Sequence, residues 1–274
     1  MPGLHLCKAH AYGNDFLLAR LADATGDPQA LARALCDRHR GIGADGLILY
    51  ELDQATTSMR LLNADGSLSE LSGNGLRCLA ALSARAGRLQ KGASVTIATD
   101  AGTKRLELLE VDAHRYTFRA ALGTPEDIRQ VRIALHGETV TATVLRMGNP
   151  QCVVLGPLPD RDRFQRLGPA LATHSMFPAG TNVEFAHVES NGDVRILIWE
   201  RGVGPTSSSG TGASAAAVAA SAHGGAARAV NVSAPGGTQR VEWQEDGVYL
   251  TGWAELVLEG EWFGARPGTT FLRV

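Results

Sequence analysis

The chain has 274 residues, 44% of them hydrophobic, and a formal net charge of −2 at pH 7. This length and apolar content suffice for one large domain or for two of ordinary size. Because no basic block stands out, neither a nucleic acid nor a membrane surface is an expected partner, and the expected ligand is a small molecule.

The strands outnumber the helices along the chain. Four segments with helical periodicity are predicted as helices: 28–40, 74–88, 160–173 and 212–222. Alternating or continuous apolar runs predict strands at 46–51, 94–98, 105–111, 116–120, 140–145, 152–155, 182–188, 194–200, 229–233, 240–243, 248–253 and 254–259. Many strands with few helices, spread over both halves, predict an α+β fold of two lobes.

The boundary between the lobes is predicted at the turn-forming residues 123–127, Gly-Thr-Pro-Glu-Asp. The end of the chain contains a further apolar segment that is expected to return to the first lobe. The predicted lobes are residues 1–122 with 264–274, and residues 123–263. A cleft between two such lobes is the expected place for a shared ligand site.

Cysteine and histidine spacing indicates neither a metal site nor a disulfide framework. The cysteines at 7, 36, 78 and 152 lack ligand spacing, and the histidines form no helical pair. Polar residues such as Lys8 and Asn14 interrupt the first 20 residues, and no apolar run reaches roughly 18 residues. We therefore expect a reduced, cytoplasmic protein that does not span a membrane.

One short motif occurs twice, separated by half the length of the chain: Ser72-Gly73-Asn74-Gly75 and Ser209-Gly210-Thr211-Gly212. Each copy opens a predicted helix, where the first backbone amides lack intrahelical partners and the helix dipole is positive. Glycine lets a ligand approach the backbone closely, so a carboxylate is the expected guest. A single copy is explained by an ordinary serine cap, but two copies at matching positions favour a duplicated lobe with one shared site.

Several further strings accompany the repeated motif. In chain order they are HAYGNDF (10–16), GIGADG (41–46), NADGS (63–67), ELSGNGLRC (70–78), MGNP (147–150), NVEF (182–185) and WERGVG (199–204). Together these strings resemble the diaminopimelate epimerase family over most of the chain. The resemblance implies two pseudo-symmetric lobes, each a curved, mostly antiparallel sheet around a central helix, and often a homodimer.

The resemblance also implies an activity, namely racemisation or epimerisation at an amino-acid α-carbon with neither pyridoxal phosphate nor metal. In that family one group removes the α-proton from one face and its counterpart delivers a proton to the other face. Inversion of a carbon requires an acid/base group on each side, which a duplicated lobe supplies. The backbone at both helix starts would hold the substrate carboxylate.

The chain departs from the family at the two acid/base positions, where Ser72 and Ser209 stand in place of cysteines. Ionising a cysteine thiol at pH 7 costs roughly 2 kcal/mol, whereas a hydroxyl with the pKa of water requires about 12 kcal/mol. A helix N-terminus supplies only about 0.3–2 kcal/mol of this. No general base is evident beside either serine in the sequence, and Glu70 is interpreted as a capping or solvated acid.

Two explanations of the serines are open: an introduced double Cys→Ser change and natural divergence. Gln151 also stands where the family usually has histidine, and Pro205 where it usually has glutamate. Because an inactivating change of the cysteines would not alter those positions as well, we favour natural divergence.

The expected substrate contacts are largely in place. The resemblance assigns the catalytic positions to Ser72 and Ser209. It assigns substrate binding to Asn14, Asn63, Gly73, Asn74, Asn149, Asn182, Glu200, Arg201, Gly210 and Thr211. Arg201 would pair with a carboxylate of the substrate through its planar guanidinium.

Three functions are compatible with a chain that keeps the family's substrate-binding residues and has different acid/base residues. The first is a two-base epimerase that converts LL- to meso-diaminopimelate, in the route to lysine and peptidoglycan. The second is a divergent isomerase or dehydratase of another amino acid, for which one strong base is enough. The third is a catalytically inactive homologue that binds an amino acid.

Overall fold

The computed structural model describes residues 3–52, 57–69, 72–135 and 137–264. The chain divides into two compact units: unit 1 is Met1–Tyr116 with Ala254–Val274, and unit 2 is Thr117–Trp253. Each unit combines strands with helices, so the predicted α+β class is confirmed. The predicted boundaries lay six residues later at the first crossing and ten later at the second, because strands β8 (Arg115–Ala121) and β17 (Gly247–Trp262) run through the crossings.

Helices form at all four predicted places. They are α1 (Pro28–Cys36), α2 (Gly73–Arg85), α3 (Arg161–Ala172) and α4 (Gly210–His223), and a short 3-10 helix η1 covers Leu21–Asp23. Helix α1 ends four residues before the predicted end because the Asp37 backbone turns extended and its carboxylate accepts hydrogen bonds from the amides of His39 and Arg40. Capping by short polar side chains thus decides the helix ends.

Unit 1 is built on a sheet that includes strands the sequence did not predict. Besides parts of β8 and β17, its strands are β1 (Leu4–Ala11), β2 (Asn14–Arg20), β3 (Gly46–Leu52), β4 (Thr57–Asn63), β5 (Leu68–Ser69), β6 (Ser94–Thr99) and β7 (Gly102–Asp112). Strands β1 and β2 form a hairpin whose two turn residues, Tyr12 and Gly13, have φ values of 56° and 85°. Positive φ at both central positions is typical of tight hairpin turns.

Unit 2 repeats the arrangement. Besides parts of β8 and β17, its strands are β9 (Glu126–Leu135), β10 (Glu138–Arg146), β11 (Pro150–Leu155), β12 (Asn182–Ser190), β13 (Asp193–Glu200), β14 (Gly204–Thr206), β15 (Ala229–Ala234) and β16 (Gly237–Gln244). The pairing β2–β3 is parallel and β3–β4 antiparallel, and likewise β11–β12 is parallel and β12–β13 antiparallel. This shared order makes β3 equivalent to β12 and β4 equivalent to β13.

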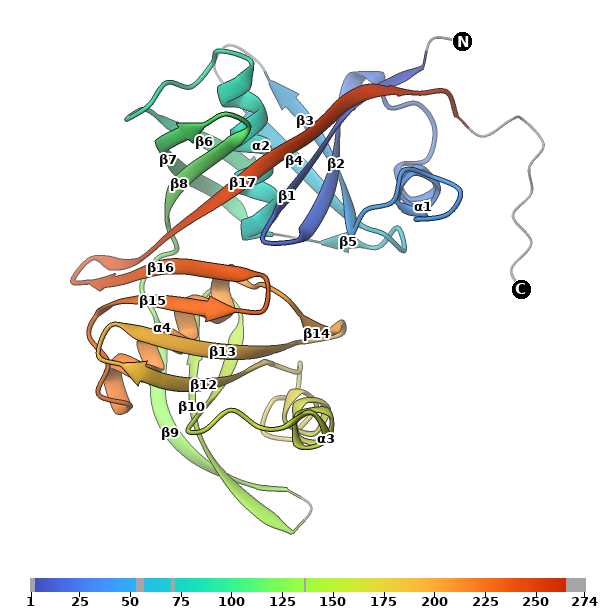
Figure 1. The fold of residues 1–274 in the computed structure, drawn as a ribbon. Coiled ribbons are helices and arrows are strands. Elements are labelled where there is room, and N and C mark those ends of the chain that lie inside the picture. The colour runs from blue at the N-terminus through green and yellow to red at the C-terminus, as the bar shows by residue number, and fades with distance from the viewer. Residues whose placement is uncertain (1–2, 53–56, 70–71, 136, 265–274) are drawn as a thin grey trace. The chain divides into compact units, whose positions relative to one another are not determined.

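A central helix lies against the sheet of each unit (Figure 1). Helix α2 packs on β1, β2 and β3, and α4 packs on β10–β13, β15 and β16. Helix α4 is buried on nearly all sides and consists largely of alanine, which lets the strands approach its backbone. The start of each helix is therefore held by packing as well as by its cap.

Candidate active site

Ser72 and Ser209 cap the two central helices in the same way. The Ser72 Oγ accepts a hydrogen bond from the Gly75 amide at 3.1 Å, and the Ser209 Oγ accepts one from the Gly212 amide at 3.2 Å. Both serines have extended backbones, with φ and ψ of −133° and 120° for Ser72 and −142° and 127° for Ser209. The repeated motif thus produces two equivalent N-caps.

The second glycine of each motif makes room for a strand side chain. A Cβ at Gly212 would lie 2.6 Å from the Glu184 Oε1, and a Cβ at Gly75 would lie 3.1 Å from the Ile48 Cδ1. At Gly73, the first glycine of its motif, a Cβ would by contrast have no other atom within 4 Å. The first turn of each helix is consequently in contact with the middle of its sheet.

Glu200 lies beside Ser209. Its carboxylate accepts hydrogen bonds from the Ser209 hydroxyl and from the Thr206 Oγ1, the latter at 3.2 Å. Burial raises the pKa of Glu200 above its usual value, and the two hydroxyl donors oppose that rise by stabilising the ionised form. The sequence showed no carboxylate beside Ser209, but the tertiary structure places the Glu200 carboxylate there, at the end of β13.

Glu184 lies on β12, beside the start of α4. Its side chain is fully buried, and neither carboxyl oxygen has a hydrogen-bond partner among the described residues. Burial, and secondarily the charge of Glu200, raises the pKa of Glu184 well above its usual value. An ionised carboxyl in such a place costs several kcal/mol, more than the roughly 0.3–2 kcal/mol that a helix N-terminus returns.

The two units differ at the positions that hold these glutamates. Ile48 is the third residue of β3 and Glu184 the third residue of β12. Asn63 is the last residue of β4 and Glu200 the last residue of β13. Unit 2 therefore has two carboxyl groups around its capping serine where unit 1 has a hydrocarbon side chain and an amide.

Among the described residues, no carboxylate is hydrogen-bonded to Ser72. Over the part of the chain that the structure describes, its side chain has the Gly75 amide as its hydrogen-bond partner. Glu70, the nearest carboxylate in sequence, lies outside the described residues. Among the described residues, the two serines are alike in backbone and differ in their hydrogen-bond partners.

Unit 1 brings Asn14 and Asn74 together. The Asn74 Nδ2 donates to the Asn14 Oδ1 at 3.2 Å, and the Asn14 Nδ2 donates to the Asp45 Oδ2 at 2.8 Å. The buried Arg77 donates to the Asn74 Oδ1, while Arg38 anchors Asp45 at 2.8 Å. This hydrogen-bonded chain fixes the orientation of both amides.

Asn63 is separate from that chain. It is exposed, and its Nδ2 donates to the Ser67 Oγ at 2.9 Å. Its position at the end of β4 follows from the register in which Gly46 pairs with Asn63.

Unit 2 brings Asn149, Asn182 and Arg201 to one end of its sheet. The Asn182 Oδ1 accepts a hydrogen bond from the Arg201 backbone amide at 2.9 Å. Gln151 pairs in register with Asn182, and its Nε2 donates to the Asn149 Oδ1 at 2.6 Å. The Arg201 guanidinium donates to the Ala179 carbonyl at 2.9 Å.

A family model described as diaminopimelate epimerase matches residues 6–125 and 143–257. The chain belongs to the diaminopimelate epimerase family. It is 41% identical to the diaminopimelate epimerase of Desulforudis audaxviator, over 96% of this chain and all of that protein. Against that of Xylella fastidiosa the identity is 37%, over 95% of this chain and 97% of the relative. The predicted family is confirmed.

Solved structures share the fold of this family member. A hydroxyproline epimerase from Agrobacterium vitis, with bound trans-4-hydroxy-L-proline, has a TM-score of 0.71 at 17% identity and covers 94% of this chain and 91% of its own. The structure of a protein described as a predicted epimerase from Pseudomonas aeruginosa has a TM-score of 0.72 at 16% identity, and the match covers 96% of this chain and 100% of that chain. At identities of 16–17%, these comparisons show a shared fold and carry no conclusion about activity.

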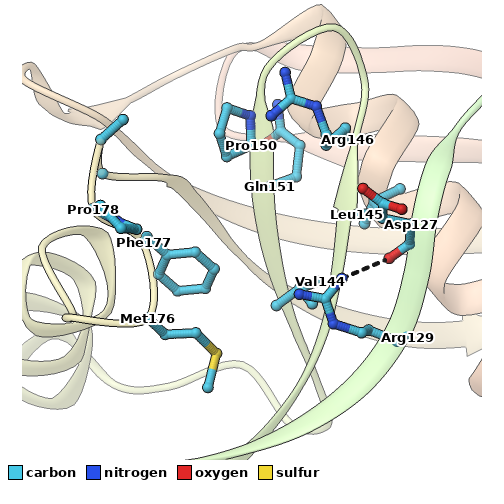
Figure 2. A pocket seen from close by; sticks show the side chains of 12 residues that line it. Asp127, Arg129, Val144, Leu145, Arg146, Pro150, Gln151, Met176, Phe177 and Pro178 are labelled. Carbon is cyan, nitrogen blue, oxygen red and sulfur yellow. Dashed lines mark hydrogen bonds between the residues drawn. The ribbon is translucent and has the colours of Figure 1, made fainter.

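An open hollow of about 320 Å³ lies in unit 2 beside Gln151 (Figure 2). Residues 176–178, which follow α3, face strands β10 and β11 across it, and Arg146 lies at its rim. Ser209 and Glu200 are not among its lining residues.

The cysteine thiols are buried, which makes them hard to ionise. All four are free and buried. Burial raises the pKa of Cys7 and of Cys36 to about 12, and also raises the pKa of Cys78 and Cys152. Among the described residues, no three His, Cys, Asp or Glu side chains are grouped for a metal ion, and no helix is long and apolar enough to cross a membrane.

Proposed function

We propose that this protein is a cofactor-independent racemase or epimerase of an amino-acid α-carbon, with LL- and meso-diaminopimelate as substrates. The observation that carries the proposal is the pair of equivalent serine-capped helix starts, one of which has a carboxylate on its hydroxyl. Relatives named diaminopimelate epimerase, aligned along nearly the whole chain, support this substrate.

Ser209 and Glu200 form the proton acceptor for one face of the substrate. The Cα–H bond breaks and leaves its electron pair on carbon, and the proton bonds to the Ser209 Oγ while the hydroxyl proton passes to the Glu200 carboxylate. Because both transfers occur together, no free alkoxide forms, and the cost of about 12 kcal/mol for ionising an isolated hydroxyl is avoided. On the opposite face the Ser72 hydroxyl donates its proton to the carbon while the Ser72 oxygen takes up a proton from solvent water. The Glu200 carboxyl afterwards returns its proton to solvent, so that protons and charge balance.

The helix starts hold the substrate carboxylate. Each serine occupies the third amide of its helix, so the amides of the first two residues remain for a ligand. These residues are Gly73 and Asn74 in α2, and Gly210 and Thr211 in α4. The open space at Gly73 admits a carboxylate against the backbone.

The remaining polar residues select the substrate. Asn14, Asn63, Asn149 and Asn182 are assigned to its amino and carboxylate groups. Arg201, which forms no ion pair among the described residues, is assigned to the distal carboxylate. Glu200 is assigned first to Ser209, because its carboxylate already holds that hydroxyl.

A second candidate is a reaction that needs a base on one face only, as in an isomerase or dehydratase of another amino acid. The difference between the units favours it, since Ile48 and Asn63 stand where unit 2 has Glu184 and Glu200. A binding protein without turnover is the third outcome.

Proton NMR in D2O distinguishes the three. The protein is incubated with LL- and meso-diaminopimelate, and then with other amino acids, while the α-proton signal is followed. Exchange with inversion supports the epimerase, and exchange or elimination without inversion supports the one-base reaction. Saturable binding without exchange refutes both. Ser72→Ala and Ser209→Ala report which face each serine serves.

Location and assembly are also proposals. From the scattered free cysteines we infer a cytoplasmic protein. From the resemblance we infer a homodimer, and sedimentation equilibrium measures the mass that tests it.

A further inference from the structure

Glu184 lies close to both Ser209 and Glu200. It pairs with Ile198 across β12 and β13, and Glu200 lies two residues beyond Ile198. Because alternate residues share a face of a sheet, Glu184 and Glu200 project from the same face. Ala186 and Ile196 of that face pack against the alanines of α4. The two carboxyls thus lie between the sheet and the helix that Ser209 caps.

The Glu184 carboxyl lies close to the Ser209 hydroxyl. A Cβ built on Gly212 would lie 2.6 Å from the Glu184 Oε1 and 3.2 Å from the Ser209 Oγ. The two oxygens are therefore within about 6 Å of each other, a range in which charges shift each other's titration. Gly212 itself leaves the space between them free of a side chain.

The two carboxyls differ in their ability to carry a charge. Glu200 receives hydrogen bonds from the hydroxyls of Ser209 and Thr206. Glu184 receives none from any residue that the structure describes, and it is fully buried. Two neighbouring buried carboxyls do not both ionise readily, so the first charge goes to the one with donors.

Few other titratable groups surround Glu184. From β11 comes the buried Cys152 thiol, from β13 comes Glu200, and α4 has no Asp, Glu, Lys or Arg. The remaining polar influence is the N-terminus of α4. No cation of the described residues forms an ion pair with Glu184, so nothing there compensates a second negative charge.

We propose that Glu184 keeps its proton at neutral pH and thereby leaves the single negative charge of the carboxyl pair on Glu200, as a positioning residue of the Ser209 site. This inference rests on the proposed function for its catalytic meaning. The equivalent position in unit 1 holds the uncharged Ile48, which agrees with a neutral side chain at this place in both units.

Infrared spectroscopy of the full chain in D2O at about pH 7.5 tests the proposal without any need for turnover. Burial raises the pKa of Glu184 and of Glu200, so these are the two described carboxyls to which a protonated-carboxyl absorption is assigned by substitution. We expect a protonated-carboxyl absorption that Glu184→Gln removes and Glu200→Gln retains. Its absence from the wild type, or its survival in Glu184→Gln, overturns the proposal.

Two controls keep the test interpretable. Glu184→Met, apolar and of similar length, serves if the glutamine variant fails to fold, and it must also lose the absorption. If the enzyme turns over a substrate, kcat is measured against pH for the wild type and for Glu184→Gln. The midpoint of the fall in kcat at acid pH should differ between the two by no more than about 0.3 pH unit. A midpoint that moves to lower pH by about one unit would show that Glu184 had been charged. Failure to detect exchange with any amino acid would count against the proposed function, while the infrared result still decides the state of Glu184.

Discussion

The carboxyl of Glu184 occupies the space that a side chain at Gly212 would need, with its Oε1 2.6 Å from the Cβ position. Gly212 does not have a left-handed backbone, so glycine is required there for room and not for conformation. The sequence motif and the buried acid are thereby coupled, although 27 intervening residues separate them in the chain.

Gly212→Ala should destabilise the protein by about 1–3 kcal/mol, because the new methyl group overpacks the site. Urea unfolding measures the loss. Gly73→Ala is the matched control, since the space around that Cβ is open to 4 Å, and its effect should stay within about 0.5 kcal/mol. If the clash with Glu184 is the cause, Gly212→Ala and Glu184→Ala will not be additive. Additive effects would contradict this explanation.

Glu184→Gln should flatten the pH dependence of stability. Above the ordinary pKa of glutamate, the unfolded chain releases a proton that the folded Glu184 retains, since its folded pKa is raised. Stability of the wild type therefore falls as pH rises from the unfolded to the folded pKa, by about 1.4 kcal/mol per pH unit for this group. Urea unfolding of both proteins between about pH 5 and 8 checks the difference in slope. Parallel curves would exclude a retained proton.

Glu200→Gln should slow α-proton exchange by about 10²- to 10⁴-fold, because the amide cannot accept the Ser209 proton. In the wild type the exchange rate should fall as pH drops through the pKa of Glu200, which burial places above the usual glutamate value. Deuterium exchange followed by NMR measures both effects. Thr206→Val is the comparison: it removes one donor to Glu200 and should move the acid limb to higher pH. Unchanged exchange in Glu200→Gln would remove Glu200 from the mechanism.

Asn74→Ala should cost about 3 kcal/mol, because it leaves the buried guanidinium of Arg77 without its side-chain acceptor. Arg77→Met, which removes the buried charge itself, should cost less. Chemical unfolding of both single variants and of the double variant gives the coupling between the two residues. A larger loss in Arg77→Met than in Asn74→Ala would show that Arg77 stabilises the fold by more than this contact.

Local patterns predicted some elements better than others. The four helices were predicted because their apolar periodicity and caps are read within a few residues of sequence. Strand β1 was missed, since a bulge between Lys8 and Ala9 breaks the alternation that identifies a strand. Strand β9 was missed because most of its residues are exposed or half-buried and its first two residues belong to the turn-forming string 123–127, which together resemble a loop.

The sequence by itself determined the two serine caps and the family. A cap involves a side chain and an amide three residues later, so its pattern survives in the sequence. Only the tertiary structure decided which groups surround each cap. Glu200 reaches Ser209, and Glu184 reaches Gly212, because the register of β12 and β13 and the packing of α4 bring distant segments together. Strand register and helix packing depend on contacts summed over the whole core, and no local string records them.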